Sequence, residues 1–362
     1  MARFLRTFDY FAFFLALALS AIGILAIASA TYASRRQELA ARQLAWLGIS
    51  IVALFVTLVI DYRKIAAFAG LLYTAMAGVL FAILAYGQMR KGAQSWFAIG
   101  SVTIQPSELA KVTLALLLAK YVISRSGRFL TFFELCVIGI ITAIPMALVL
   151  LQPDMGTAMT LTPIAFAAAF LGGIRIRYYV IIIVVVAIAL PAVYFFGLKP
   201  YQKERILTFI DPGRDPQDAG WQVRQSLIAV GSGGMTGKGY RNGSQTRLQF
   251  VPEQHTDFIF TVWAEEMGFL GTGIAIGLYL MLVTRILGTA AVSRDLLGAV
   301  ICGCFAASLA FQGLGNLCMV INLLPTTGIP LPLMSYGGTS LVATYVFLGL
   351  SMNVRMRRLE AY

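Results

Sequence analysis

The sequence predicts an all-α polytopic membrane protein with about ten transmembrane helices and one large extracytoplasmic loop between the seventh and the eighth. The 362 residues are 59% hydrophobic and only 12% charged, whereas soluble domains are about 45–50% apolar and about 25% charged. Apolar runs of about 20 residues, the length that crosses a bilayer as a helix, recur along the chain. One long polar stretch, at about residues 198–257, interrupts them. We therefore expect a single transmembrane domain over residues 1–362.

The first apolar run follows Arg3 and Arg6. It is long enough to span a membrane, so we interpret it as the first helix rather than as a cleaved secretory signal. Short segments rich in Gly, Pro or charged residues separate the later runs. The predicted spans cover residues 9–31, 44–60, 65–86, 107–124, 131–151, 156–172, 178–197, 258–284, 296–321 and 339–354.

The basic residues indicate how the chain is oriented, because cytoplasmic loops carry an excess of Lys and Arg. The connections on one predicted side contain most of them, among which are Arg63, Lys64, Arg125, Arg128, Arg175, Arg177, Arg285 and Arg294. The short loops on the other side contain only Arg35, Arg36, Arg42, Arg90 and Lys91. This pattern places both termini in the cytoplasm and the unusual polar segments on the outer face, which we expect to be the working face.

The net charge is +12, but the basic residues form no stripe with interleaved aromatic residues. Nucleic-acid binding is therefore not expected. The chain has four cysteines, all within apolar stretches, and their spacing fits neither a disulfide framework nor a zinc site. The only histidine, His255, has no second histidine with which to bind a metal.

Three ionisable residues are expected at the starts of the fourth and sixth spans. Glu108 and Lys111 are three residues apart, so they share one helix face and are close enough to pair. Charged groups within a membrane face the protein interior or a water-filled cavity. Glu108 and Lys111 therefore have two possible roles. They are either a charged pair that lines a substrate cavity, with Lys111 free to meet phosphate, or a buried structural ion pair. Asp154 either caps the next helix through the helix dipole or takes part in the site.

The long loop contains a candidate surface helix at residues 222–230 and a glycine-rich run at residues 231–239. The first has the amphipathic pattern of helices that lie on a membrane surface. The second lacks the spacing of a nucleotide-binding loop. It can form a tight turn that presents N–H groups and Lys238 to an anion, or it can be a plain flexible hinge.

Asp257 is the strongest catalytic candidate. It lies at the start of the eighth span, beside His255 and below a loop that contains Arg205. Partial removal from water would raise the pKa of this carboxyl toward the range of a general base, and nearby cations would oppose that shift. The alternative is a carboxylate that only complements the helix N-terminus. His255 alone is more often structural than catalytic.

The segment at residues 325–340 is rich in Pro and Gly and carries no charge. Irregular backbone at membrane depth is tolerated only where it packs within protein or lines a cavity. We therefore expect a re-entrant wall beside the site, in which Ser335 is a candidate for a substrate contact.

These motifs resemble the SEDS family (shape, elongation, division and sporulation), and the resemblance extends over nearly the whole chain. It rests on Lys91-Gly-Ala-Gln-Ser-Trp96, Gln105-Pro-Ser-Glu-Leu-Ala-Lys111, Gln152-Pro-Asp154-Met-Gly-Thr, the run 228–239, residues 252–258, Ala264-Glu-Glu-Met-Gly268 and the segment 325–340. The sequence at residues 91–94 resembles the rod-shape branch of the family more than the division branch. Ser95 stands where many members have a basic residue.

The resemblance implies a ten-helix peptidoglycan glycosyltransferase in the bacterial cytoplasmic membrane, with Asp257 at the family's essential carboxylate. Its substrates would be lipid II and the growing glycan strand. Its partners would be a class B penicillin-binding protein, which supplies transpeptidase activity, and other membrane proteins of the elongation complex.

The expected chemistry fits these residues. Asp257 would take the proton of the acceptor hydroxyl, and an α-linked donor would become a β-1,4 glycan by inversion. Lys111, Arg205 and Lys238 would stabilise the leaving diphosphate, with or without a divalent cation such as Mg²⁺ or Mn²⁺. Trp96 would either stack on sugar or lipid, or anchor its loop at the interface.

Two other functions remain open at this point. A ten-span protein with Glu108, Lys111 and Asp154 near the membrane could flip a lipid-linked precursor, or the chain could be a non-catalytic scaffold for the class B penicillin-binding protein. The polar elements cluster on one face, however, whereas alternating access favours a site at the midplane between repeats.

Overall fold

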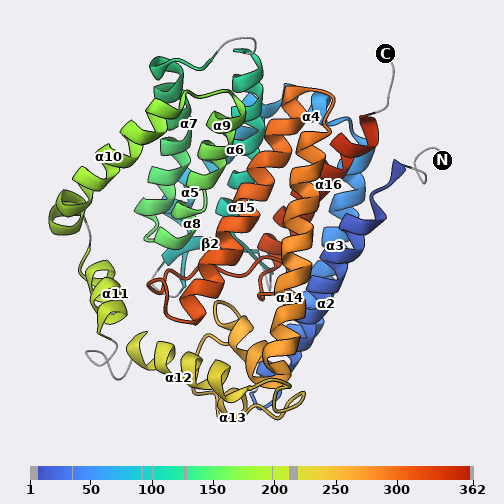
Figure 1. The fold of residues 1–362 in the computed structure, drawn as a ribbon, viewed down its shortest axis with the longest axis vertical. Coiled ribbons are helices and arrows are strands. Elements are labelled where there is room, and N and C mark those ends of the chain that lie inside the picture. Colours follow the sequence, from blue (N-terminus) through green and yellow to red (C-terminus); the bar gives the residue numbers. More distant parts are fainter. Residues whose placement is uncertain are drawn as a thin grey trace.

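The computed structural model describes residues 7–34, 36–90, 93–99, 102–125, 129–197, 199–211 and 219–358. Within these ranges the chain forms a bundle of long helices, with the helices of the large loop at one end and both described termini at the other (Figure 1). Among the described residues, six helices are long and apolar enough to cross a membrane. They are α2 (Tyr10–Ala30), α3 (Glu38–Val59), α5 (Ala69–Tyr86), α7 (Phe132–Leu151), α14 (Ile259–Ala291) and α15 (Leu296–Val320).

The fourth, sixth, seventh and tenth predicted spans also contain helices, but these helices are either short or contain charged residues. The fourth is α6 (Pro106–Ile123), which includes Glu108, Lys111 and Lys120. The sixth is divided into α8 (Met155–Met159) and α9 (Thr162–Leu171), because Pro163 begins a new helix after a turn. The seventh is α10 (Ile176–Ala192), continued by a π-helical turn at Val193–Gly197. The tenth is α16 (Gly338–Arg357).

Two helix limits differ from the prediction because polar residues extend the helices past the apolar runs. Helix α3 begins at Glu38 rather than near residue 44, and its first turns carry a Glu38–Arg42 ion pair of 3.0 Å. Helix α14 continues to Ala291 rather than ending near residue 284. A short helix, α4 (Tyr62–Ala67), precedes α5 and is separated from it at Phe68.

A three-stranded antiparallel sheet between α5 and α6 is an addition to the predicted all-α fold. Its strands are β1 (Gln88–Arg90), β2 (Ala93–Ile99) and β3 (Val102–Ile104), in the order β1-β2-β3. In β2 and β3, Phe97 pairs with Ile104 and Ala98 with Thr103. These strands were not predicted, because they are short and lie between two strongly apolar helices.

The described part of the large loop forms three helices, α11 (Pro200–Ile210), α12 (Ala219–Ser232) and α13 (Ser244–Arg247). Helix α12 contains the amphipathic segment that was predicted to be helical. The glycine-rich run then joins α14 at a break in that helix, where Gly268 has φ +63°. Here Phe269 N donates to Gly234 O (2.8 Å) and Lys238 N donates to Glu265 O (3.1 Å). The loop is thereby hydrogen-bonded to a transmembrane helix.

The centre of the bundle is formed by α15, which packs against α6, α9, α14 and α16. Cys302 and Cys304 of α15 are fully buried and pack in this centre, whereas Cys318 is half-buried and Cys136 is exposed, so burial was wrongly expected for Cys136. Phe305 stacks on Phe347 of α16 with ring centroids 4.9 Å apart. Helix α16 packs along α3, and α2 packs along α14. The segment at residues 325–337 connects α15 to α16 within this framework, and it forms one wall of the cavity described below.

Candidate active site

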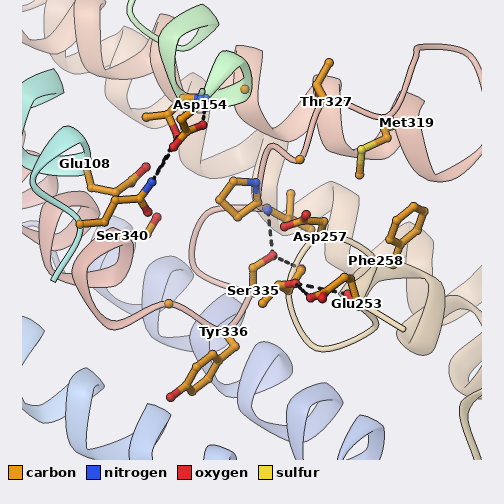
Figure 2. A pocket seen from close by; sticks show the side chains of 18 of the residues that line it. Glu108, Asp154, Glu253, Asp257, Phe258, Met319, Thr327, Ser335, Tyr336 and Ser340 are labelled. Carbon is orange, nitrogen blue, oxygen red and sulfur yellow. Dashed lines mark hydrogen bonds between the residues drawn. The ribbon is translucent and has the colours of Figure 1, made fainter. Parts of the chain in front are cut away.

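A cavity of about 700 Å³ lies where the large loop meets the bundle. Its walls come from the start of α6, the start of α8, residues 253–258, the segment 325–337, Arg205 of α11 and Trp96 of β2. Figure 2 shows Asp257, Glu253 and Ser335 together on one side, with Asp154 and Glu108 on the other. Six of the nine predicted site residues line this cavity, namely Trp96, Glu108, Asp154, Arg205, Asp257 and Ser335.

Asp257 precedes α14 without capping it. Phe258 is the N-cap residue of that helix, and its side chain makes no capping hydrogen bond. The side chain of Asp257 instead lies at the cavity wall. A carboxylate one residue before the N-cap still complements the helix N-terminus, and its position at the cavity also makes it available to a ligand.

The backbone at Asp257 is fixed by two buried polar side chains. Asn316 of α15 donates from Nδ2 to Asp257 O (2.7 Å) and to Ile329 O (2.8 Å). Ser335 donates from Oγ to Thr256 O (2.7 Å) and accepts from Leu331 N (2.8 Å). These bonds connect the turn before α14 to the segment 325–337. Sequence reasoning missed Asn316, because its partners are 59 and 13 residues away along the chain.

A second carboxylate, Glu253, lines the same part of the cavity. It accepts a hydrogen bond from Thr256 Oγ1 at 3.0 Å. Glu253 was not predicted from the sequence, although its position four residues before Asp257 in a polar turn was a usable signal. The two carboxylates place negative charge on one side of the cavity.

The starts of α6 and α8 meet on the opposite side. Gln105, the N-cap residue of α6, donates from Nε2 to Asp154 Oδ2 at 3.0 Å. Asp154 caps α8 by accepting from Thr157 N (3.0 Å) and Thr157 Oγ1 (2.9 Å). Burial raises the pKa of Asp154 and the nearby charge of Glu108 raises it further, while the Thr157 hydrogen bonds partly oppose both. Asp154 is thus both a cap and a cavity residue.

Glu108 lines the cavity, but its predicted partner Lys111 does not. Lys111 is only 4% exposed. Its Nζ is 2.8 Å from Glu108 Oε2 and 3.0 Å from Gln312 Oε1 of α15. The structure therefore favours the buried structural ion pair of the two alternatives, with the carboxylate at the cavity and the ammonium behind it.

Lys238 and His255 also have surroundings other than the cavity. Lys238 Nζ is 2.7 Å from Glu265 Oε1 and 2.9 Å from Ser244 Oγ. Because Lys238 N and Gly239 N donate to the carbonyls of Glu265 and Glu266, these groups of the glycine-rich run are not open to an anion. His255 accepts from Tyr336 N through its carbonyl (3.0 Å), and the two rings are 6.1 Å apart.

Arg205 is the only Lys or Arg among the described residues that line the cavity. Its Nη1 donates to Thr326 O at 3.1 Å, so α11 is attached to the segment 325–337. Arg205 lines the same cavity as Asp257, where it would meet an anionic group of a ligand. No group of three or more His, Cys, Asp or Glu residues in the described parts of the chain could hold a metal ion by itself.

Comparison with known proteins identifies the family. The FtsW/RodA/SpoVE family of cell cycle proteins matches residues 9–360. The peptidoglycan glycosyltransferase MrdB of Escherichia coli strain K12 is 36% identical over 317 residues, covering 88% of this chain and 85% of MrdB. The peptidoglycan glycosyltransferase RodA of Treponema pallidum strain Nichols is 32% identical over 432 residues, covering 99% of each chain.

Two solved structures share the fold along almost the whole chain. One is a chain of a peptidoglycan synthase complex studied for the coordination of polymerization and crosslinking, with a TM-score of 0.86, 33% identity, and coverage of 98% of this chain and 99% of that one. The other is the rod shape determining protein RodA of Thermus thermophilus, with a TM-score of 0.73, 29% identity and coverage of 98% of each chain. The chain described here therefore belongs to the FtsW/RodA/SpoVE, or SEDS, family of multi-pass membrane proteins.

Proposed function

We propose that this protein is a peptidoglycan glycosyltransferase that polymerises lipid II into β-1,4 glycan strands during cell elongation. The names of its full-length relatives support this reaction class. The observation that carries the proposal is the cavity, in which Asp257 and Arg205 line the same space. A carboxylate and a guanidinium are the base and the anion-stabilising group that transfer from a lipid diphosphate requires.

In the proposed reaction, Asp257 removes the proton from the acceptor sugar hydroxyl. The resulting oxygen attacks the anomeric carbon of the donor, forming the new C–O bond as the bond to the diphosphate breaks. Attack opposite the leaving group inverts an α-linked donor into a β-linked product. Arg205 stabilises the charge that develops on the departing lipid diphosphate, and the proton passes from Asp257 to water.

The far side of the cavity is suited to binding sugars. Gln105, Glu108, Asp154 and Thr157 present amide, carboxyl and hydroxyl groups around one wall, and such groups hydrogen-bond to sugar hydroxyls. Trp96 supplies a flat apolar surface at the same cavity. We assign this wall to positioning the saccharide relative to Asp257, because oriented reactants lower the barrier to transfer.

A divalent cation fits the site only together with the substrate. Glu253 and Asp257 provide two carboxylates on one side of the cavity. Mg²⁺ is commonly bound by one or two carboxylates plus substrate phosphates. These residues would hold the cation, which would help to neutralise the diphosphate. Lys111 and Lys238, being engaged with Glu108 and Glu265, have no part in this scheme.

The proposal also includes a location and partners. The end that carries α11–α13 and the cavity is assigned to the outer face of the cytoplasmic membrane, with both termini in the cytoplasm. The basic connections at the opposite end support this orientation through the positive-inside rule. The similarity to a chain of a complex that couples polymerization with crosslinking supports a class B penicillin-binding protein as the partner. Other membrane proteins of the elongation complex are proposed to join this pair.

The test is polymerisation of labelled lipid II by the purified protein with its class B partner. We expect Asp257→Asn to abolish glycan formation, because the amide cannot accept the proton, with a loss of at least about 100-fold. Asp211→Asn, a matched change in the large loop away from the cavity, should keep full activity. EDTA followed by Mg²⁺ or Mn²⁺ in the same assay tests the cation.

Full glycan synthesis by Asp257→Asn would contradict the proposed chemistry. Synthesis by the partner alone would make this chain a scaffold. Movement of labelled lipid II across liposome membranes without polymer formation would instead identify a flippase.

A further inference from the structure

Three helices converge on one buried carboxylate at the end of the bundle opposite α11–α13. Asp9 caps α2 and receives two hydrogen bonds from Arg285 of α14, from Nε at 3.0 Å and from Nη2 at 2.9 Å. Arg355 of α16 approaches the same carboxylate, with Nε 3.3 Å from Oδ2. The side chain of Asp9 is 2% exposed, whereas those of Arg285 and Arg355 are 31% and 18% exposed.

This cluster retains positive charge after pairing. Two guanidinium groups share a single carboxylate, so one positive charge is left uncompensated among the three side chains. Arg358, one turn further along the chain, interacts electrostatically with Arg355 and adds to this charge. Within the described residues, Asp9 is the only carboxylate that forms an ion pair with Arg285 or Arg355.

A hollow of about 340 Å³ opens beside the two arginines. Arg285 and Arg355 form its charged part, and Thr284 adds a hydroxyl. Its remaining walls are apolar and face outward, with Phe11 of α2 50% exposed and Met281 of α14 44% exposed. The hollow lies at helix ends, near the start of α2 at Tyr10 and the end of α14 at Ala291, which is the headgroup level of a membrane-spanning bundle.

We propose that this hollow binds the headgroup of an anionic glycerophospholipid, with the phosphate at Arg285 and Arg355 and an acyl chain along Phe11 and Met281. Basic pockets between transmembrane helices recognise anionic lipid headgroups by this combination of charge and apolar wall. The exposed apolar side chains favour a lipid, because an acyl chain would pack on them. Free phosphate would make no such contact. A partner's apolar helix would bury the uncompensated charge, which is unfavourable. The bound lipid would join α2, α14 and α16, and this role is independent of the glycosyltransferase reaction.

Glycine 288 allows the hollow to be filled without disturbing the helix. A Cβ atom at Gly288 would meet nothing within 4 Å, and the residue lines the hollow. Gly288→Leu should therefore fold and occupy the space of the lipid. Gly273 is a matched control, because it is exposed on the same helix, also has open space at its Cβ, and is not part of the hollow.

The experiment measures lipid binding to the purified full chain by native mass spectrometry. Phosphatidylglycerol and phosphatidylcholine with identical acyl chains are compared, and inorganic phosphate is added in a separate arm as a competitor. We expect phosphatidylglycerol to bind at least about fivefold more tightly than phosphatidylcholine, the contribution of roughly one basic side chain. Gly288→Leu and Arg355→Gln should each weaken phosphatidylglycerol binding by about fivefold, while Gly273→Leu should leave it unchanged.

Equal affinity for the two lipids, or equal binding of phosphatidylglycerol by the Gly288 and Gly273 variants, would overturn the proposal. Displacement of phosphatidylglycerol by inorganic phosphate would identify a site for the free anion and would overturn the lipid assignment. Displacement by the class B partner would assign the hollow to a protein. Thermal unfolding of each variant checks that a loss of binding does not come from a loss of folding.

Discussion

Asp257 depends on neighbouring side chains for its position, because no regular helix holds it. Asn316 and Ser335 bond to the backbone at residues 256–257 and connect this turn to the wall of the cavity. Both side chains are buried, with exposures of 0% for Asn316 and 7% for Ser335. We regard them as positioning residues. Sites of this kind lose activity when the supporting shell is loosened, even though the reacting groups are intact.

Ser335→Ala tests this role. The change removes the hydroxyl that donates to Thr256 O and accepts from Leu331 N. We expect kcat for lipid II polymerisation to fall by about tenfold to a hundredfold, because a misplacement of about 1 Å can reduce rates by that factor. The KM for lipid II should change little, since the sugar-binding wall is on the other side of the cavity. Steady-state kinetics of the purified complex provide the measurement.

A buried serine elsewhere serves as the control for Ser335→Ala. Ser20 is 1% exposed, hydrogen-bonds to Tyr345 Oη at 3.0 Å and is not among the cavity-lining residues. Ser20→Ala should lower stability by about 0.5–1.5 kcal/mol and leave kcat unchanged. Ser335→Thr, which keeps a hydroxyl, should recover part of the activity. Similar loss of kcat in Ser20→Ala and Ser335→Ala would mean that Ser335 contributes only to general stability.

Residue type and local position were enough to predict part of the candidate site. They were not enough to predict which charged side chains pair with one another, and the reason is physical. Asp257, Asp154 and Glu108 were selected because each is an ionisable residue in a polar motif beside an apolar span, and all three line the cavity. Lys238 was expected to meet an anion, and Lys111 was expected either to meet phosphate or to pair with Glu108; in the structure each ion-pairs with a glutamate. The Lys238 partner is 27 residues away. Pairings over such distances depend on how the helices pack, and charge patterns along the chain do not contain that information.

At the scale of elements, the break in α14 joins the large loop to the bundle. Gly268 has a positive φ of 63°, and a Cβ there would lie 2.3 Å from Gly237 N and 2.8 Å from Met235 O. The break exposes backbone groups of α14, which bond to the glycine-rich run instead of to the helix. This connection places the loop at the end of the bundle that contains the cavity.

Gly268→Ala should therefore destabilise the protein by about 2–4 kcal/mol, from backbone strain and from the displaced loop. The measurement is thermal unfolding of the detergent-purified protein. Gly277→Ala on the same helix is the matched control, because a Cβ at Gly277 meets nothing within 4 Å. It should be neutral or stabilising by up to about 1 kcal/mol. Unfolding of both variants at the same temperature would refute the argument from the break.

A second connection between elements depends on pH. Asp295 caps α15 by accepting from Gly298 N (2.8 Å) and also accepts from Tyr62 Oη (2.7 Å) and Arg63 Nε (2.9 Å), near the start of α4. Burial by itself raises the pKa of Asp295, but these hydrogen bonds and the charge of Arg63 outweigh it and hold the pKa below its usual value of 3.8. The ionised carboxylate is thus favoured in the folded state.

Because the folded pKa lies below the unfolded one, this stabilisation is complete above about pH 5 and is lost as the pH falls through the folded pKa. Asp295→Asn should lower the unfolding temperature at about pH 7, and the difference from the unchanged protein should shrink in more acidic buffer. Tyr62→Phe, which removes one hydrogen bond, should give a smaller difference with the same direction. A difference that stays constant down to about pH 3 would contradict this account.

On the scale of the whole molecule, hydropathy predicted the long helices closely, whereas the sheet was not predicted. Helix α2 was expected at residues 9–31 and is found at Tyr10–Ala30, because burial of a continuous apolar run in a bilayer leaves few alternatives to a helix. Strands β1 and β3 have three residues each. Segments of that length carry too few residues for an alternating pattern, and their stability comes from pairing with β2.

The arrangement of charge over the molecule leads to the final prediction, which concerns orientation. Arg63, Lys64, Arg285, Arg294 and Arg355 lie in or near the connections at the end with both termini, whereas the cavity lies at the other end. If the positive-inside rule holds, the cavity faces outward, where lipid II is polymerised in the proposed function.

Single cysteines test this orientation in a variant that lacks Cys136, Cys302, Cys304 and Cys318. Leu248→Cys, at an exposed position of the large loop, should react with a membrane-impermeant maleimide in intact cells. Arg294→Cys, between α14 and α15, should react only after the membrane is permeabilised. The reverse pattern would place Asp257 on the cytoplasmic side. A polymerase that builds the external cell wall could not then use this cavity, so the assignments of Asp257, Arg205 and the sugar-binding wall would fail together.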